Sequence, residues 1–106
     1  MNASTIVVFI TAKDRQEAQG IAQALVQEKL IACANVLGNV ESLFWWEGSV
    51  DRSQEVLLIL KTKRNLFNKI VKRVKTLHSY KTPEIIALPI VIGSKDYLNW
   101  IKESVC

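Results

Sequence analysis

The apolar block Leu43-Phe44-Trp45-Trp46 constrains the fold of this chain more than any other feature. It ends an extended segment, residues 32–46, and Glu47-Gly48-Ser49 then begins a turn. A strand covered on one face alternates apolar and polar residues, and this block does not alternate. Each aromatic side chain carries about 150–250 Å² of surface, so exposing the block would be a liability in a monomer. We therefore expect this strand end to overhang its own sheet and pair with another subunit.

An interior hairpin is the alternative for the same block. The strand end would then fold beneath the last helix, where Trp100 would pack against it. The chain has 106 residues, which predicts a single domain spanning residues 1–106. A domain of this size leaves much of its surface exposed, and oligomerisation adds core. The overhanging strand is therefore the favoured prediction.

Hydrophobic periodicity predicts the order of the elements. Asp14 and Glu17 have the spacing of a capping box at the start of the first helix. Gly38-Asn39 is expected to bend the second strand through a bulge, and Ser94 to cap the last helix. Strands are predicted over residues 5–11, 32–46, 56–60 and 84–92, and helices over 14–29, 66–77 and a short segment after Ser94. This order predicts an α+β domain, a ferredoxin-like split β-α-β sandwich whose first two helices cover one face of an antiparallel sheet.

The charge of the chain is concentrated in one segment. Residues 61–81 hold eight basic and no acidic residues, although the formal net charge of the whole chain is only +4. The neighbouring strands lack the aromatic pair that RNA-recognition sheets use, so no nucleic-acid partner is expected. The basic residues either form a solvated helix face or, at Lys61, Lys63 and Arg64, attract an anion.

The compartment is predicted from cysteine content and hydropathy. The chain has two cysteines, too few for a disulfide framework. No apolar run reaches the roughly 20 residues of a membrane span, and the start of the chain lacks a signal-peptide pattern. We therefore expect a cytoplasmic protein without membrane contact. Cys33 lies among small apolar residues and is expected to be buried.

The catalytic inventory is short. His78, Tyr80 and Glu84 lie near one another in sequence and have the side chains that acid–base chemistry needs, but no nucleophile stands beside a base. The favoured interpretation is that His78 and Tyr80 close the helix end and Glu84 pairs with a lysine; a ligand site comes next and catalysis last. Cys33 and His78 are the only soft metal ligands inside the domain, and they lack zinc-site spacing. A metal site shared between subunits, with Glu84 added, stays open.

The chain resembles the CutA divalent-cation tolerance proteins. The resemblance runs from about Val7 to Ile101, and the order and spacing of its motifs make it specific. The matching motifs are Val7-Val8-Phe9-Ile10-Thr11-Ala12, Glu28-Lys29-Leu30-Ile31-Ala32-Cys33-Ala34-Asn35-Val36, Trp46-Glu47-Gly48, Glu55 to Lys61-Thr62, His78-Ser79-Tyr80-Lys81-Thr82-Pro83-Glu84-Ile85-Ile86, Pro89-Ile90 and Tyr97-Leu98-Asn99-Trp100-Ile101.

The resemblance implies a tight homotrimer with strands pairing between subunits. It also implies a cytoplasmic bacterial protein, a link to copper and other divalent ions, and no established catalytic activity. The family's usual His-Pro-Tyr is His78-Ser79-Tyr80 here. Some members carry two further proposed copper ligands at the positions of Ile10 and Leu77, so His78 is the only predicted metal ligand of that set.

These observations predict a trimeric, non-enzymatic protein of divalent-metal tolerance with ligand sites in clefts between subunits. The predicted site residues are Lys61, His78, Tyr80 and Glu84, with Trp46, Glu47 and Tyr97 as the cleft wall. A trimeric small-molecule sensor similar to the nitrogen-regulatory PII proteins is the alternative, with an anion beside Lys61, Lys63 and Arg64. An acylphosphatase-like enzyme is disfavoured, because Ala12-Lys13-Asp14 replaces the arginine-bearing loop after the first strand.

Overall fold

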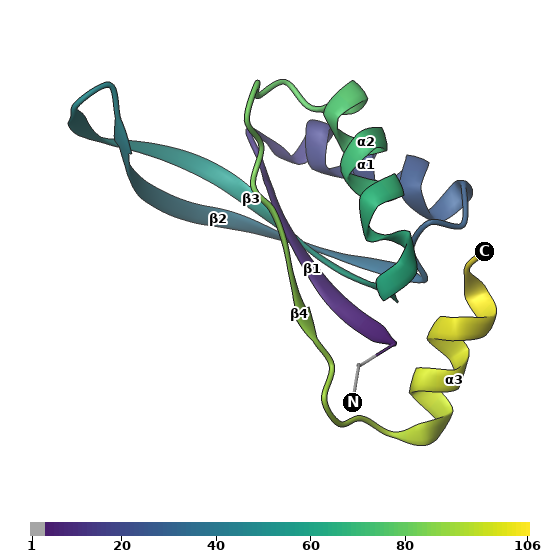
Figure 1. The fold of residues 1–106 in the computed structure, drawn as a ribbon. Coiled ribbons are helices and arrows are strands. Elements are labelled where there is room, and N and C mark those ends of the chain that lie inside the picture. Colours follow the sequence, from purple (N-terminus) through teal and green to yellow (C-terminus); the bar gives the residue numbers. More distant parts are fainter. Residues whose placement is uncertain (1–3) are drawn as a thin grey trace.

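The computed structural model describes residues 4–106, and the first three residues of the predicted domain lie outside this range. Four strands form one antiparallel sheet in the order β2-β3-β1-β4 (Figure 1). The elements are β1 (Thr5–Ala12), α1 (Arg15–Gln27), β2 (Cys33–Trp46), β3 (Ser49–Lys63), a 3₁₀ turn η1 (Arg64–Leu66), α2 (Phe67–Leu77), β4 (Ile85–Pro89) and α3 (Lys95–Ser104). The predicted α+β class with an antiparallel sheet is confirmed.

The core lies between one face of the sheet and helices α1 and α2, which lie side by side on that face (Figure 1). Alternate residues of β1 and β3 point into it, because side chains along a strand alternate between faces. Helix α1 contributes a stripe at helical spacing, and α2 contributes Ile70 and Val74. The most deeply buried members are Val8, Ile10, Ala18, Leu25, Leu58, Leu60, Ile70 and Val74.

The predicted helix caps are present. Asp14 accepts a hydrogen bond from the Glu17 backbone N–H at 2.8 Å, and Glu17 accepts one from the Lys13 N–H at 3.1 Å. Two otherwise orphaned amides are thereby satisfied. At the last helix, Ser94 Oγ accepts from the Tyr97 N–H at 3.2 Å. Both helices therefore begin where the sequence predicts.

The second face of the sheet is covered only in part. Val7 and Phe9 of the central strand β1 are half-buried on this face, whereas their neighbours Val8 and Ile10 are fully buried on the other. Helix α3 lies at one end of the second face, with Ile101 fully buried and Tyr97 in contact with Cys33 of β2. The near-continuous apolar run of residues 5–11 predicts a strand covered on both faces, but in one chain this second face of β1 is covered only in part.

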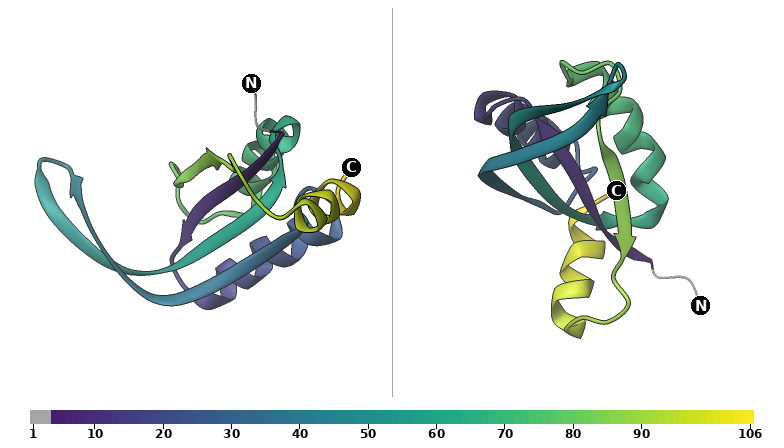
Figure 2. Two further views of the ribbon diagram at one scale, coloured as in Figure 1. Left: turned by 90° about the horizontal axis from the view of Figure 1, so that it is seen from below. Right: turned by 90° about the vertical axis from the view of Figure 1, so that its left-hand side faces the viewer.

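Strands β2 and β3 continue far beyond the rest of the sheet as a two-stranded ribbon. We define residues 40–55 as the hairpin arm, in which Val40 pairs with Glu55 and Trp46 with Ser49. Strand β1 pairs with β3 only from Val56 onward, so within residues 4–106 no other strand lies beside the arm. Figures 1 and 2 show it projecting from the body and curving away. The predicted overhang is confirmed, and the interior hairpin beneath the last helix is wrong.

The bend in β2 comes from the predicted bulge. The pairing register shifts between Leu37 and Val40, and Asn39 in the bulge has a left-handed backbone with φ of +62°. Asparagine tolerates this conformation better than most residues. The bulge bends the ribbon at the point where it leaves the body.

Two strand lengths differ from the prediction. Strand β3 runs over 15 residues instead of the five predicted at 56–60, because its polar first half pairs with the arm of β2. Strand β4 is shorter than predicted and ends at Pro89, which cannot donate to a ladder. Val91 and Ile92 beyond it are 85% and 86% exposed. Within residues 4–106, no helix is long and apolar enough to cross a membrane.

Candidate functional site

Six of the seven predicted site residues lie in three separate places in one chain, and the seventh, Glu84, lies apart from them just before β4. His78 and Tyr80 lie where α2 ends, together with Glu17 and Glu55, and we call these four residues the helix-exit cluster. Lys61 and Tyr97 lie on the second face of the sheet. Trp46 and Glu47 lie at the tip of the hairpin arm.

His78 is held by backbone groups on both sides of its ring. Nε2 lies 2.7 Å from the Thr11 carbonyl oxygen, and Nδ1 accepts the Tyr80 N–H at 3.0 Å. A carbonyl oxygen only accepts and a backbone N–H only donates, so the proton is on Nε2 and the ring is neutral. The His78 side chain is completely buried. These bonds tie the exit of α2 to the end of β1.

Glu17 joins α1 to the same loop. Besides its capping bond from Lys13, it accepts the Ser79 N–H at 2.8 Å, and it lies 3.7 Å from His78 Nδ1. Partial burial acts to raise the pKa of Glu17, but hydrogen bonds from Ser79 and Lys13 lower the pKa overall. The carboxylate is therefore stabilised in its charged form.

Tyr80 completes the helix-exit cluster. Its hydroxyl donates to Glu55 Oε2 at 2.9 Å, and its ring lies 4.8 Å from that of His78. Burial, and then the hydrogen bond to Glu55 and the charge of that carboxylate, raise the pKa of Tyr80 to about 12. The phenol is therefore a fixed donor to a buried carboxylate at neutral pH.

A second cluster forms where β2, β3 and α3 meet. Lys61 Nζ donates to Asn35 Oδ1, and the Tyr97 hydroxyl lies 3.6 Å from Cys33 Sγ. Cys33 and Lys61 are direct partners across the β2–β3 ladder. The contact with Cys33, and then burial, raise the pKa of Tyr97. Lys61 and Tyr97 therefore share one end of the second face, as the predicted cleft requires.

The burial of Cys33 differs from the prediction. It was predicted to be buried, but it is only half-buried and is a free thiol. The reason is its place at the start of β2, an edge strand, with its side chain on the second face, where Tyr97 of α3 contacts it.

Trp46, Glu47 and Glu84 stand apart from both clusters. Trp46 is 58% exposed, and Glu47 takes a left-handed backbone with φ of +49° in the arm's turn. Glu84 is exposed just before β4 and makes no ion pair with a residue in 4–106. One chain therefore does not bring the seven predicted residues together.

In a single subunit, the surroundings of His78 do not form a copper site. Each ring nitrogen already has a hydrogen-bond partner, so coordination requires one of those bonds to break. Among residues 4–106, no three His, Cys, Asp or Glu side chains come close enough to hold a metal ion. The prediction of His78 as a ligand has no support from the geometry of one subunit.

Sequence reasoning identified the main site residues but missed the residues that hydrogen-bond to them. Glu17 was identified only as a helix cap, and its second oxygen reaches Ser79, which is 62 residues away. Asn35 and Glu55 lie within motifs of the family resemblance, but no local pattern links them to Lys61 and Tyr80. These contacts depend on sheet register, which single-residue chemistry does not reveal.

Comparison with known proteins identifies the family. The model of the CutA1 divalent ion tolerance protein family matches residues 6–104. A divalent-cation tolerance protein CutA of Thermus thermophilus is 46% identical over 98 residues, covering 92% of this chain and 95% of that protein. A chloroplastic CutA 1 protein of Oryza sativa is 42% identical over 94% of this chain, which spans only 56% of the rice protein.

Solved structures agree with this assignment. The structure of a divalent cation tolerance protein (Cut A1) from Thermus thermophilus has a TM-score of 0.95 at 44% identity, covering 96% of this chain and 99% of that one. The structure of CutA from Xylella fastidiosa also has a TM-score of 0.95, at 34% identity, covering 98% of this chain and all of that one. The chain therefore belongs to the CutA1 divalent ion tolerance protein family.

Proposed function

We propose that this chain works as a homotrimeric, non-enzymatic protein of divalent-ion tolerance that binds a ligand in clefts between subunits. In this proposal its ferredoxin-like β-α-β sandwiches are joined by pairing of the hairpin arms. The observation that carries the proposal is the exposure of the arm. Leu43, Trp45, Trp46 and Val50 are 57%, 76%, 58% and 60% exposed on a ribbon that one chain cannot cover.

Burial of apolar surface drives the proposed assembly. Each square ångström of apolar surface removed from water contributes roughly 25 cal/mol, and the arm concentrates such surface on an unpaired ribbon. An isolated two-stranded hairpin is at best marginally stable in water. Another subunit packed against the arm would remove both liabilities.

The separation of the predicted site residues supports a shared cleft. Trp46 and Glu47 are carried away from their own body by the arm, so they are placed to contribute to a neighbouring subunit. The helix-exit cluster and the pair Lys61–Tyr97 stay on the body. In the proposed trimer, the arm tip of one subunit lies against the body of the next and completes the site.

We propose a binding or regulatory role in preference to catalysis. His78 and Tyr80, the best acid–base candidates, are engaged by Thr11, by the loop backbone and by Glu55. A cytoplasmic location is likewise a proposal. The names of relatives include a chloroplastic protein from Oryza sativa and a periplasmic one from Archaeoglobus fulgidus.

Copper titration by calorimetry tests the role of the ion. Because each ring nitrogen of His78 has a partner, we expect wild-type and His78→Ala proteins to take up micromolar copper equally. Copper binding that is present in the wild type and lost in His78→Ala would contradict this expectation and would support His78 as a copper ligand. Sedimentation at micromolar concentration tests the assembly itself, and a monomer would overturn the proposed shared cleft.

A further inference from the structure

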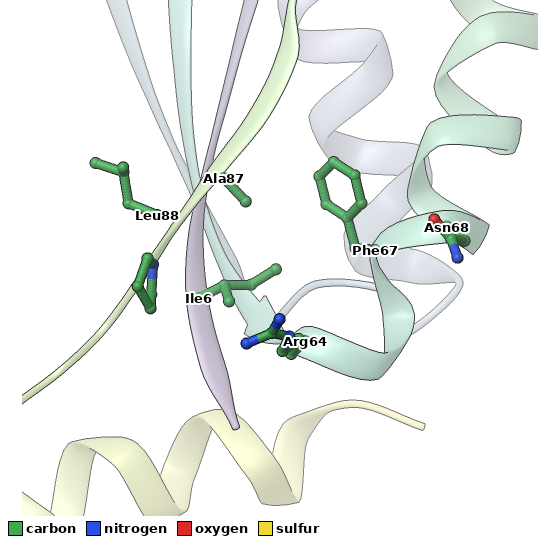
Figure 3. A pocket seen from close by; sticks show the side chains of 7 residues that line it. Ile6, Arg64, Phe67, Asn68, Ala87 and Leu88 are labelled. Carbon is green, nitrogen blue, oxygen red and sulfur yellow. The ribbon is translucent and has the colours of Figure 1, made fainter. Parts of the chain in front are cut away.

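A cavity of about 450 Å³ lies between the edge strand β4 and the start of α2. It opens on the helix side of the sheet, away from the face that holds Lys61 and Tyr97. Its size is within the range of small-molecule sites, roughly 300–1,000 Å³. The lining residues are Ile6, Arg64, Phe67, Asn68, Ala87, Leu88 and Pro89 (Figure 3).

The interior of this cavity is apolar. Ile6, which is 4% exposed, and Ala87 point from the strands toward the side on which the Phe67 ring lies (Figure 3). The hollow exists because Ala87 carries only a methyl group at a position of β4 that faces the helices. A larger side chain there would fill the gap between β4 and α2.

The polar part of the lining is positive or neutral. Arg64 lies between the strands and the start of α2 in Figure 3, and Asn68 follows on the first turn. Within residues 4–106, no carboxylate pairs with Arg64. The first turn of α2 carries no acidic residue and no side-chain cap, so the positive end of the helix dipole adds to the guanidinium.

We infer that this cavity binds a small amphipathic carboxylate, with the hydrocarbon part against Ile6, Phe67 and Ala87 and the carboxylate on Arg64. Charge complementarity selects the headgroup, because a guanidinium hydrogen-bonds a carboxylate through two parallel N–H groups. The apolar lining selects a ligand with a hydrocarbon chain over a bare anion. All seven lining residues belong to one chain, and none is a predicted residue of the proposed inter-subunit cleft, so either site can fail while the other stands.

Octanoate is the probe for this site. Amide NMR of the wild-type protein is expected to show saturable shifts at Arg64, Phe67 and Ala87, with a Kd at or below ~1 mM. Octan-1-ol lacks the carboxylate and acetate lacks the hydrocarbon chain. Each is expected to bind at least about tenfold more weakly than octanoate. Shifts that are the same for acetate and octanoate would overturn the inference in favour of a bare anion site.

Two variants test the contacts separately. Arg64→Gln is expected to weaken octanoate at least about tenfold, as loss of a charged hydrogen bond predicts, while Lys75→Gln on the far end of α2 leaves the affinity unchanged. Ala87→Leu is expected to abolish binding by filling the cavity, and its amide spectrum reports whether it is folded. No saturable octanoate binding, or equal losses in Arg64→Gln and Lys75→Gln, would overturn the site even if Ala87→Leu failed to fold.

Discussion

Glu17 performs two structural tasks with one carboxylate. It satisfies the amide that precedes α1 and the Ser79 amide in the loop after α2, so it connects the two helices that cover the core. Its side chain is only 9% exposed, which limits the screening of these bonds by water. We expect Glu17→Gln to lower the free energy of unfolding at pH 7 by about 1–2 kcal/mol, as loss of hydrogen bonds to a charged group predicts.

The pH dependence of that loss follows from the lowered pKa of Glu17. The unfolded carboxyl titrates near 4.5 and the folded one lower, so the unfolded chain takes up the proton first as the pH falls. The stability difference between the wild type and the Glu17→Gln variant should be constant above pH 4.5 and shrink below it. Urea unfolding between about pH 3 and pH 7 measures this, with the exposed Glu103→Gln as control. A difference between wild type and variant that grows on acidification would contradict this role.

At the residue scale, sequence predicts roles that are local. The cap of Asp14 and the cap of Ser94 are visible because each bond spans three residues. The partners of His78 are not visible, because Thr11 is 67 residues away and offers a backbone oxygen that every residue has. The half-burial of Cys33 was also missed, because it depends on which face of an edge strand α3 covers.

The turn of the hairpin arm rests on one glycine. Glu47 and Gly48 form a two-residue connection, and both have positive φ, at +49° and +83°. Such turns match the twist of the flanking strands, and only glycine adopts the second conformation without strain. We expect Gly48→Ala to lower the free energy of unfolding by about 1 kcal/mol, measured by urea denaturation.

A matched control exists on α1. An added methyl group at either Gly48 or Gly20 would meet no atom of residues 4–106 of the same chain within 4 Å, so neither substitution causes a clash there. Gly20 lies inside a helix, where alanine is preferred by about 0.5–1 kcal/mol. Gly20→Ala should therefore stabilise the protein. If both substitutions changed the free energy of unfolding in the same direction, backbone strain at the turn could not explain the effect of Gly48→Ala.

At the element scale, the order of strands and helices is predictable, but the lengths of β3 and β4 are not. Every predicted helix and strand is present, because the spacing of apolar residues along each one has the period of that element. The first half of β3, Ser49 to Gln54, buries no apolar side chain within the chain and so carries no strand pattern. Its conformation is imposed by the ladder with β2. Sequence pattern alone therefore underestimates the arm.

At the scale of the whole molecule, one chain does not bring the predicted site residues together. They fall into a helix-exit cluster, a pair at the end of the second face, an arm tip, and Glu84 just before β4. Sequence resemblance groups these residues but does not reveal their separation within a subunit. The proposed shared site therefore depends on assembly: the arm must bury its apolar side chains against another copy.

Sedimentation equilibrium at micromolar concentration tests that claim most directly. The account predicts a mass three times the 12.0 kDa of the chain. Replacing Trp45 and Trp46 together by serine should shift the protein toward monomer, whereas Val26→Ser, an exposed apolar position on α1, should remain trimeric. A wild-type protein that sediments as a monomer, or an arm variant that stays fully trimeric, would contradict the account.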